Sequence, residues 1–264
     1  EVVTEIEGGS STVVLSATSG PIILSVLAES REEQLVTEGV EVSAYTLTGS
    51  DGADDVIEVQ SEIGFVLEGA SGADTLIGGS GDDTLIGGGG DDVFVVDGGE
   101  DVIDGGAGRD ALDFSASVAG VQVDLSTGTL VDGEGFEDQF SSIEIVTGST
   151  FDDTLLGGSG DDTLIGGDGS DVLVGGPDDG LPGTDADVAV FEGSKGSYEF
   201  GVDAVSGSLT VTSKDTGSVD ILEGIETLSF GDGPLTVSRP SSDAAFTLTG
   251  SDGADDVIEV QSEI

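Results

Sequence analysis

Residues 69–113 read GASGADTLI-GGSGDDTLI-GGGGDDVFV-VDGGEDVID-GGAGRDALD, which is five consecutive nonapeptides of one pattern. The pattern is G-G-x-G-x-D-x-U-x, in which U is a large apolar residue. A short internal period is the signature of a stacked repeat architecture, because one repeat alone cannot bury its apolar face. This stretch therefore decides the fold class, and the rest of the chain is interpreted around it.

The same nonapeptide returns in other parts of the chain. A second run occupies residues 148–174 and reads GSTFDDTLL-GGSGDDTLI-GGDGSDVLV. Single copies stand at residues 49–57 and 250–258, and a broken copy surrounds Asp187. In each copy the glycines favour a tight turn, and the x-U-x end favours a very short strand whose U side chain points inward. Two nonapeptides then make one coil, and coils stack at the ordinary strand spacing of about 4.8 Å.

This geometry predicts an all-β fold: a parallel β-roll (β-solenoid) with flanking antiparallel β segments. The inner rows of the rolls are expected at Leu76, Leu85, Phe94, Ile103 and Leu112 and at Leu155, Leu164 and Leu173. Along the chain we expect a β-rich N-terminal segment or cap (1–45), a first roll (46–118), a β-rich insertion or cap (119–147), a second roll (148–191), a β-rich C-terminal flank (192–245) and the start of a next tandem unit (246–264).

A second, much longer repeat supports the last assignment. Residues 46–63 read TLTGSDGADDVIEVQSEI, and residues 247–264 repeat all eighteen letters without a change, 201 positions later. Such an exact repeat indicates a tandem array whose unit is about the size of a domain. Since the chain begins at Glu1 and contains no Met, we expect it to be a piece of a longer protein.

Acidic residues dominate the charge: 55 Asp and Glu stand against 5 Lys and Arg, for a formal net charge of -50. Self-repulsion of this size opposes a compact state, so we expect a bound cation to neutralise it. The same sign excludes nucleic acid and anionic membrane surfaces as partners. With no His and no Cys, the chain can offer a metal ion only oxygen ligands. No apolar run is long enough to span a membrane.

The nonapeptide turn suits calcium. In residues 78–86, GGSGDDTLI, the glycines allow positive φ, so several carbonyl oxygens can point at one place, and the Asp at position six adds a carboxylate. Mixed oxygen coordination of this kind is typical of Ca²⁺. Because the thin core of each coil buries little apolar area and the acidic turns repel one another, ion binding becomes folding free energy.

Other chemistries fit these turns less well. Paired carboxylates such as Asp82 and Asp83 occur in glycosidases, but here such pairs recur in nearly every turn. A phosphate-binding loop would need a Lys after its glycines. An EF-hand would need flanking helices and a Glu at loop position twelve. We therefore expect calcium binding and no enzymatic activity.

The nonapeptides resemble the RTX (haemolysin-type) calcium-binding β-roll, over roughly residues 46–235 and the terminal fragment. Segments 110–129 and 197–233 are also similar to stretches around the rolls of that family. The resemblance implies that each ion lies between one turn and the turn 18 residues later. Positions two, four and six of the first turn and one, three and six of the second would supply the ligands, mostly through backbone carbonyls.

Carried over to this sequence, the resemblance implies the following ligand groups: Ala70, Gly72 and Asp74 with Gly87, Gly89 and Asp92; Gly79, Gly81 and Asp83 with Val96, Gly98 and Asp101; Gly88, Gly90 and Asp92 with Gly105, Ala107 and Asp110; Ser149, Phe151 and Asp153 with Gly166, Asp168 and Asp171; and Gly158, Gly160 and Asp162. Phe151 departs from the pattern at position four, which predicts an irregular turn there. Pro177 and the insertion 178–184 are expected to disturb the coil after Asp162.

Three further candidates, Asp54, Asp187 and Asp255, lie in isolated or broken copies. Two functions remain open. The first is an extracellular structural repeat protein, such as an adhesin stalk, a surface-layer component or a matrix fibre, whose units associate end to end or with one another. The second, implied by the resemblance, is an export and folding module that sits behind a secreted hydrolase or toxin and folds where calcium is of millimolar order. An ice-binding module would need a flat Thr array, which the sequence lacks.

Overall fold

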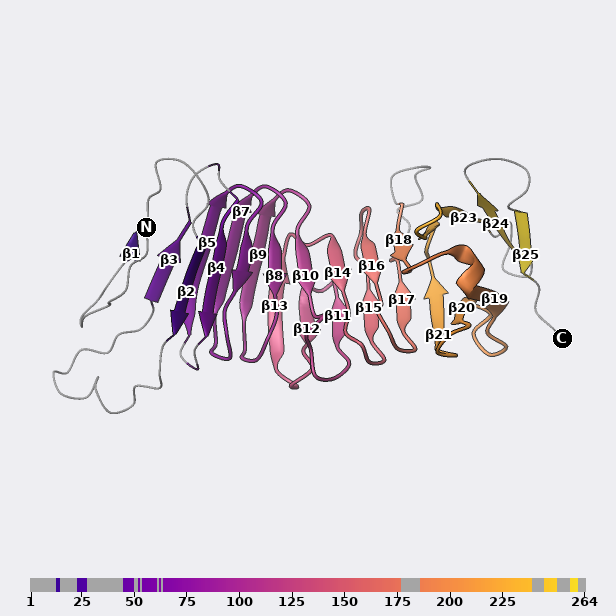
Figure 1. Ribbon diagram of the computed structural model, residues 1–264, viewed down its shortest axis with the longest axis horizontal. Coiled ribbons are helices and arrows are strands. Elements are labelled where there is room, and N and C mark those ends of the chain that lie inside the picture. The colour runs from indigo at the N-terminus through magenta and orange to yellow at the C-terminus, as the bar shows by residue number, and fades with distance from the viewer. Residues whose placement is uncertain are drawn as a thin grey trace. The chain divides into compact units, whose positions relative to one another are not determined.

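The computed structural model describes residues 13–14, 23–27, 45–49, 52, 54–60, 62, 64–176, 186–238, 245–250 and 257–260. The chain divides into two compact units: residues 1–114 with 128–143 make the first unit, and residues 115–127 with 144–264 make the second. Figure 1 labels the strands of each. The segment 119–147 thus contributes to both units. Each unit is described by itself below.

The first unit is built from two stacks of short strands. One stack runs in the order β1 (Val13–Val14), β3 (Tyr45–Thr48), β5 (Phe65–Ser71), β7 (Thr84–Gly89), β9 (Val102–Ala107), β13 (Glu137–Ser141) and β12 (Thr129–Val131). The other runs β2 (Ile23–Leu27), β4 (Val56–Gln60), β6 (Thr75–Ile77), β8 (Val93–Val95) and β10 (Ala111–Asp113). The chain alternates between the two stacks, as a roll requires.

The pairing of these strands is parallel and in the nonapeptide register. Leu67 pairs with Leu85 and Leu85 with Ile103 in one stack, while Leu76 pairs with Phe94 in the other. Each step is one coil of two nonapeptides. The strand β12 departs from this order, because it pairs antiparallel with β13.

The second unit repeats the arrangement with an antiparallel end. One stack is β11 (Gln122–Asp124), β15 (Thr154–Leu156), β17 (Val172–Val174), β21 (Val219–Glu223), β20 (Leu209–Ser213) and β19 (Tyr198–Val202). The other is β14 (Ile145–Thr147), β16 (Thr163–Ile165), β18 (Val188–Val190), β22 (Thr227–Ser229), β23 (Leu235–Ser238), β24 (Phe246–Gly250) and β25 (Val257–Val260). Pairing is parallel from β11 to β21 and from β14 to β22, and antiparallel beyond.

The core of each roll is the predicted inner row. All eight predicted side chains are fully buried, and the row is extended by others such as Ile57, Leu67 and Leu228. In the three-residue strands the middle residue is buried and its neighbours are partly exposed, as in β6 and β16. The predicted parallel β-roll with flanking antiparallel segments is thereby confirmed. The described residues contain a 3-10 turn, η1 (Lys195–Ser197), but no α-helix, and none of their elements is a helix able to cross a membrane.

The insertion after Asp162 changes the length of its coil without ending the stack. Thr163 pairs with Val188 and Leu164 with Ala189, which are 25 residues apart instead of the usual 18. Residues 177–185, with Pro177, lie outside the described residues. The strands on either side of these residues keep their parallel register.

The exact repeat adopts two different pairings. In the first copy, β3 and β4 lie in different stacks, and each pairs in parallel with the strand one coil away. In the second copy the identical residues lie in β24 and β25, which pair antiparallel with each other; Leu248 lies opposite Ile258. Because the sequences are the same, the partner strands decide the pairing, since a β segment takes its register from the neighbours it packs against.

Candidate metal-binding turns

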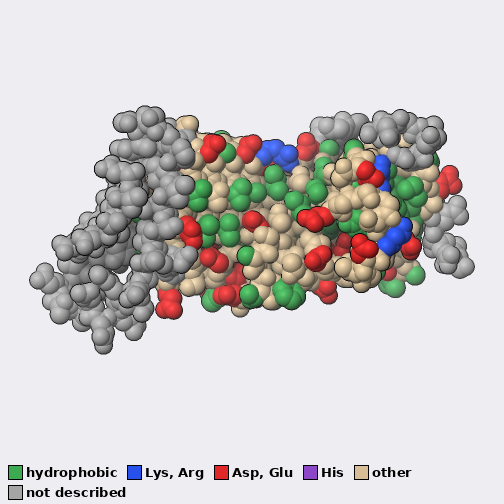
Figure 2. Space-filling model, in the orientation of Figure 1, with side chains coloured by type: hydrophobic (Ala, Val, Ile, Leu, Met, Phe, Trp, Pro, Cys, Tyr) green, Lys and Arg blue, Asp and Glu red, His purple; other side chains and the backbone are tan. Residues whose placement is uncertain are grey.

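A buried aspartate precedes the inner-row residue by two positions in nearly every nonapeptide. These side chains are at most 5% exposed: Asp55, Asp74, Asp83, Asp92, Asp101 and Asp110 in the first unit, and Asp153, Asp162, Asp171 and Asp187 in the second. Acidic side chains are almost never buried without a compensating partner. Acidic side chains also dominate the charged groups on the surface, and basic ones are few (Figure 2).

One oxygen of most of these carboxylates accepts a backbone hydrogen bond from another coil. Oδ1 of Asp92 accepts a hydrogen bond of 2.8 Å from the backbone N–H of Asp74, 18 residues earlier. Asp101 does the same for Asp83, and Asp171 for Asp153, at 2.8 and 2.9 Å. The carboxylate thus satisfies the amide at the end of the preceding turn and fixes the register of the stack.

The other oxygen of several of these carboxylates is buried and has no hydrogen-bond partner. This holds for Oδ2 of Asp74, Asp83, Asp92 and Asp171. A buried polar atom left unsatisfied costs about 1–3 kcal/mol, and more when it carries charge. The donor set of the chain contains no His or Cys, so the fitting partner is a hard cation that binds oxygen.

The turn glycines leave room beside these oxygens. An ideal Cβ at Gly69 would lie 2.7 Å from the carbonyl oxygen of Gly87 and would collide with Oδ2 of Asp74. At Gly87 the same position lies 2.7 Å from the carbonyl oxygen of Gly105 and against Oδ2 of Asp92. A carboxylate oxygen and a carbonyl oxygen of the next coil therefore converge at position one of the turn, and only glycine leaves that space open.

Burial raises the pKa of these carboxyl groups strongly. It raises the pKa of Asp74 to about 6, with the Asp92 carboxylate adding to the shift. The pKa of Asp83 and of Asp171 rises to about 7 and that of Asp101 to about 8, again mainly through burial and further through neighbouring carboxylates. Burial thus disfavours the charged form of these groups, and a bound cation would favour it.

Carboxylates alone do not complete a site. Within the part of the chain that the structure describes, no three acidic side chains are grouped closely enough to hold a metal ion. Since Ca²⁺ takes six to eight oxygen ligands, a calcium ion at these turns would need backbone carbonyls or water besides the carboxylates. Mixed sites, each with one or two carboxylates, stay the prediction.

A comparison of the sequence with known families also indicates calcium binding at these turns. The model described as "RTX calcium-binding nonapeptide repeat (4 copies)" matches residues 68–102, 86–116 and 147–181. These turns are RTX calcium-binding repeats. The matched residues include the turns whose buried Oδ2 atoms lack a partner. A comparison with curated proteins gives no match.

The first RTX run brings the predicted ligands of neighbouring coils side by side. Ala70 pairs with Gly88, and Gly88 with Gly106, across the strand ends. The carbonyl of Gly89, a predicted ligand, also accepts a 2.8 Å hydrogen bond from the amide of Gly72. A calcium ion would use the second lone pair of that carbonyl. The complete ligand groups stay predictions.

Ala70 occupies position two of its RTX turn with a φ of 81°. Non-glycine residues disfavour this left-handed region by roughly 1–2 kcal/mol. In the next two coils the equivalent residues are Gly88 and Gly106, which adopt positive φ without that cost. The first turn of the run is thus geometrically like the others but is less favourable locally.

The turn 148–153 differs from the other RTX turns, as Phe151 predicted. Oδ2 of Asp153 accepts a 2.7 Å hydrogen bond from the Ser149 amide and another from the Ser149 hydroxyl. Neither Ser149 nor Phe151 has the positive φ of a regular turn, and the Phe151 side chain is 46% exposed. Both hydrogen bonds to this oxygen come from its own turn, so the buried carboxylate of Asp153 does not need a calcium ion to compensate its burial.

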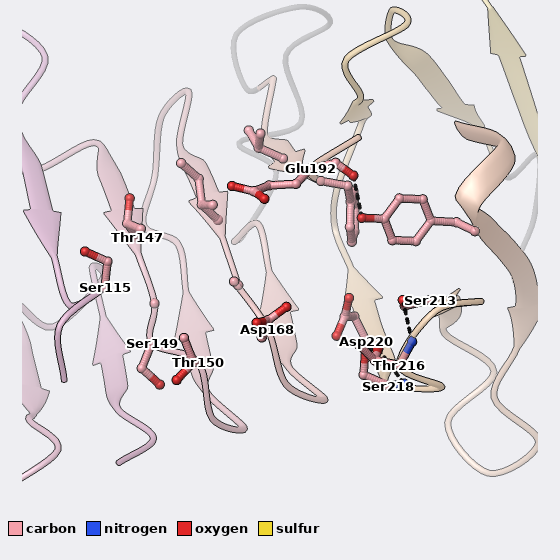
Figure 3. A pocket seen from close by; sticks show the side chains of 17 residues that line it. Ser115, Thr147, Ser149, Thr150, Asp168, Glu192, Ser213, Thr216, Ser218 and Asp220 are labelled. Atoms are coloured by element: carbon pink, nitrogen blue, oxygen red, sulfur yellow. Dashed lines mark hydrogen bonds between the residues drawn. The ribbon is translucent and has the colours of Figure 1, made fainter. Parts of the chain in front are cut away.

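Asp162 follows the same pattern, because its Oδ2 accepts a 2.6 Å hydrogen bond from the Gly158 amide. The next turn returns to the open form at Asp171. Ser149, Asp168 and Asp220 line one cavity of about 250 Å³ within the second unit (Figure 3). Ser149 and Asp168 are predicted ligands. The cavity that they line is larger than a single calcium ion needs.

The isolated copy at residues 49–57 has its register one residue later than the sequence predicted. Asp55, not Asp54, is buried there, and its amide donates to Oδ1 of Asp74 at 2.7 Å. Asp54 is exposed and accepts a hydrogen bond from the Ala73 amide. The prediction for Asp54 was wrong because this copy carries one extra residue before its inner Ile57. Asp187 is buried, and its role as a ligand stays a prediction; Asp255 lies outside the described residues.

Two buried aspartates of the same type were missed from the sequence. Oδ1 of Asp138 accepts the Asp101 amide at 2.7 Å, and Oδ1 of Asp220 accepts the Asp171 amide at 3.0 Å. Neither lies in a glycine-rich nonapeptide. The signal that could have found them is the Asp-x-apolar spacing, which pairs them with the buried Phe140 and Leu222.

Substituting the carboxylate that faces two coils tests the assigned register. Asp92→Asn keeps an oxygen for the Asp74 amide but removes the charge of a ligand predicted for two ions. We expect calcium affinity to fall at least tenfold, about 1.4 kcal/mol or more, for two ions. Isothermal titration calorimetry measures both effects. Asp54→Asn is the control, because Asp54 is exposed, and equal losses in the two variants would contradict the register.

Proposed function

We propose that this chain is an extracellular structural repeat protein whose rolls fold and stiffen when they bind Ca²⁺. The RTX repeats establish calcium binding, and the exact copies at residues 46–63 and 247–264 support the structural role. The first copy is built into a roll as its opening strands, β3 and β4. We take the second copy as the start of a further unit, although in this chain its residues pair antiparallel as β24 and β25.

Calcium dependence supports a location outside the cell. Sites that rely on one or two carboxylates and carbonyls belong to the weak class, which is filled at the millimolar calcium of extracellular fluids. Where calcium is scarce, the buried carboxylates would oppose folding and the chain would stay expanded. In this proposal the chain itself catalyses no reaction.

The same calcium-linked folding also favours the second candidate, an export and folding module. A chain that stays unfolded at low calcium can pass through a secretion channel and fold afterwards. The two roles differ in what the complete protein carries: many units of 201 residues for a fibre, or one pair of rolls behind a catalytic domain for an export module.

Electron microscopy of the full-length protein separates the two roles. In millimolar CaCl₂ the structural role predicts long rods or filaments that disappear when EDTA is added. Compact monomers that fold with calcium but never associate or extend would contradict the structural role and support the export module. A matched sample in MgCl₂ controls for general screening of the negative charge.

A further inference from the structure

The turn between β12 and β13 carries acidic groups that no nonapeptide accounts for. Asp132 stands at its start and is only 4% exposed. Its Oδ1 accepts three backbone hydrogen bonds, from the amides of Glu134, Gly135 and Phe136, at 2.9, 2.6 and 2.8 Å. Its Oδ2 is buried and has no hydrogen-bond partner. The turn therefore fixes this carboxylate rigidly while one oxygen stays unsatisfied.

A second buried carboxylate closes the same turn. Asp138 is 1% exposed, and its Oδ1 is used by the amide of Asp101. Its Oδ2, like that of Asp132, has no partner. Asp138 pairs with Leu130 across the β12–β13 ladder, and Asp132 follows Leu130 by two residues, so the two carboxylates lie on the same side of the hairpin. Both are buried on that side.

The adjacent RTX turn, residues 96–101, adds a third acidic side chain. Asp97 occupies position two, where a regular turn has glycine, and its Oδ1 is buried and unpartnered. The Glu134 carboxylate also lies directly over Gly98, so the two turns face each other.

We propose that the β12–β13 turn and the turn 96–101 form an additional calcium site, held by the unpartnered oxygens of Asp132 and Asp138 with Asp97 at its edge. Backbone carbonyls would complete the shell, because no three acidic side chains of the described residues lie close enough to bind an ion by themselves. The proposal rests on calcium-dependent folding of the rolls.

This site differs from an RTX pair in construction and in role. Asp101 and Asp138 are 37 residues apart, not one coil, and an antiparallel hairpin replaces the second glycine-rich turn. The ion would fasten that hairpin to the last regular coil of the first unit.

Asp132→Asn tests the site with little disturbance of the turn, because an amide oxygen still accepts the three backbone hydrogen bonds. Equilibrium dialysis against ⁴⁵Ca at saturating calcium should show one ion fewer per chain than in the wild type. Glu137→Gln is the matched control in the same hairpin, since Glu137 is exposed, and it should keep the wild-type number. A wild-type number in Asp132→Asn would overturn the site.

A second measurement does not depend on that variant. The chain has no Trp, and Phe136 lies in the hairpin turn with its ring near Gly98. In Phe136→Trp, Tb³⁺ bound in the calcium sites should show emission sensitised by the indole. Adding Asp132→Asn should lower that emission without abolishing it, because the RTX site predicted at Gly98 lies beside the same ring. Emission that Asp132→Asn leaves unchanged would contradict the site. Absence of sensitised emission in Phe136→Trp would contradict the site. Wild-type protein that binds calcium and folds with it, while both tests fail, would leave the proposed function standing.

Discussion

Removing calcium with EDTA is expected to unfold both rolls and to remove most of the β signal from the far-ultraviolet circular dichroism spectrum. At a net charge of -50 the acidic side chains repel one another, which destabilises the folded state. The unpartnered carboxylate oxygens of Asp74, Asp83 and Asp92 are also buried at the turns. Without an ion each of these oxygens costs about 1–3 kcal/mol or more, against a typical domain stability of about 5–15 kcal/mol. Several such costs together exceed what the thin core can supply.

Small-angle scattering should show the same transition as an expansion, toward the radius of gyration of about 57 Å that an unfolded chain of this length has. Adding excess CaCl₂ should reverse it. The control is 1 M NaCl in place of calcium, which shortens the Debye length to about 3 Å and screens the surface charge without entering the turns. Full refolding in NaCl alone, or an unchanged spectrum in EDTA, would contradict calcium-dependent folding.

Acidification of the calcium-free chain is expected to restore part of the fold. The pKa values of Asp74, Asp83 and Asp101 rise from 3.8 to about 6, 7 and 8 through burial. The folded state therefore binds more protons than the unfolded state between pH 4 and pH 8. Stability from these groups is fully present below about pH 4 and is lost as the pH rises through the folded values.

A pH titration from 8 to 4 in EDTA, followed by circular dichroism, measures this gain. Calcium affinity should fall as the pH is lowered, because protons compete with the ion for the same carboxylates. Asp171→Asn is a useful comparison, since it removes one group whose pKa is raised to about 7 and should flatten the profile. A calcium-free chain that loses β structure on acidification would contradict the assignment of these buried groups.

The sequence was sufficient to predict the roll, and the reason is its strict local periodicity. The position of a residue within the nonapeptide predicts whether its side chain is buried. This holds for inner residues such as Leu85 and Leu164 and for turn aspartates such as Asp83. The long-range contacts of a roll are contacts between equivalent positions, so they follow once the period is known.

What the sequence could not predict lies where the period breaks. The one-residue shift that buries Asp55, the hairpin that carries Asp132 and the alternative pairing of residues 247–264 all depend on which strand happens to be adjacent. The internal bonds of Asp153 depend on the Ser149 hydroxyl, which replaces a glycine. Such features come from tertiary packing and from individual side-chain hydrogen bonds, neither of which has a sequence period.

A crystal structure of the protein grown in CaCl₂ tests the central claim most directly, which is that the unpartnered buried carboxylate oxygens are calcium ligands. The account predicts ions about 2.3–2.6 Å from Oδ2 of Asp74, Asp83, Asp92 and Asp171, with carbonyl oxygens of the turns in the same shells. It predicts no ion on Oδ2 of Asp153 or Asp162, which their own turns satisfy. Water molecules or protein hydrogen bonds on the first four oxygens, with calcium absent from the turns, would contradict it.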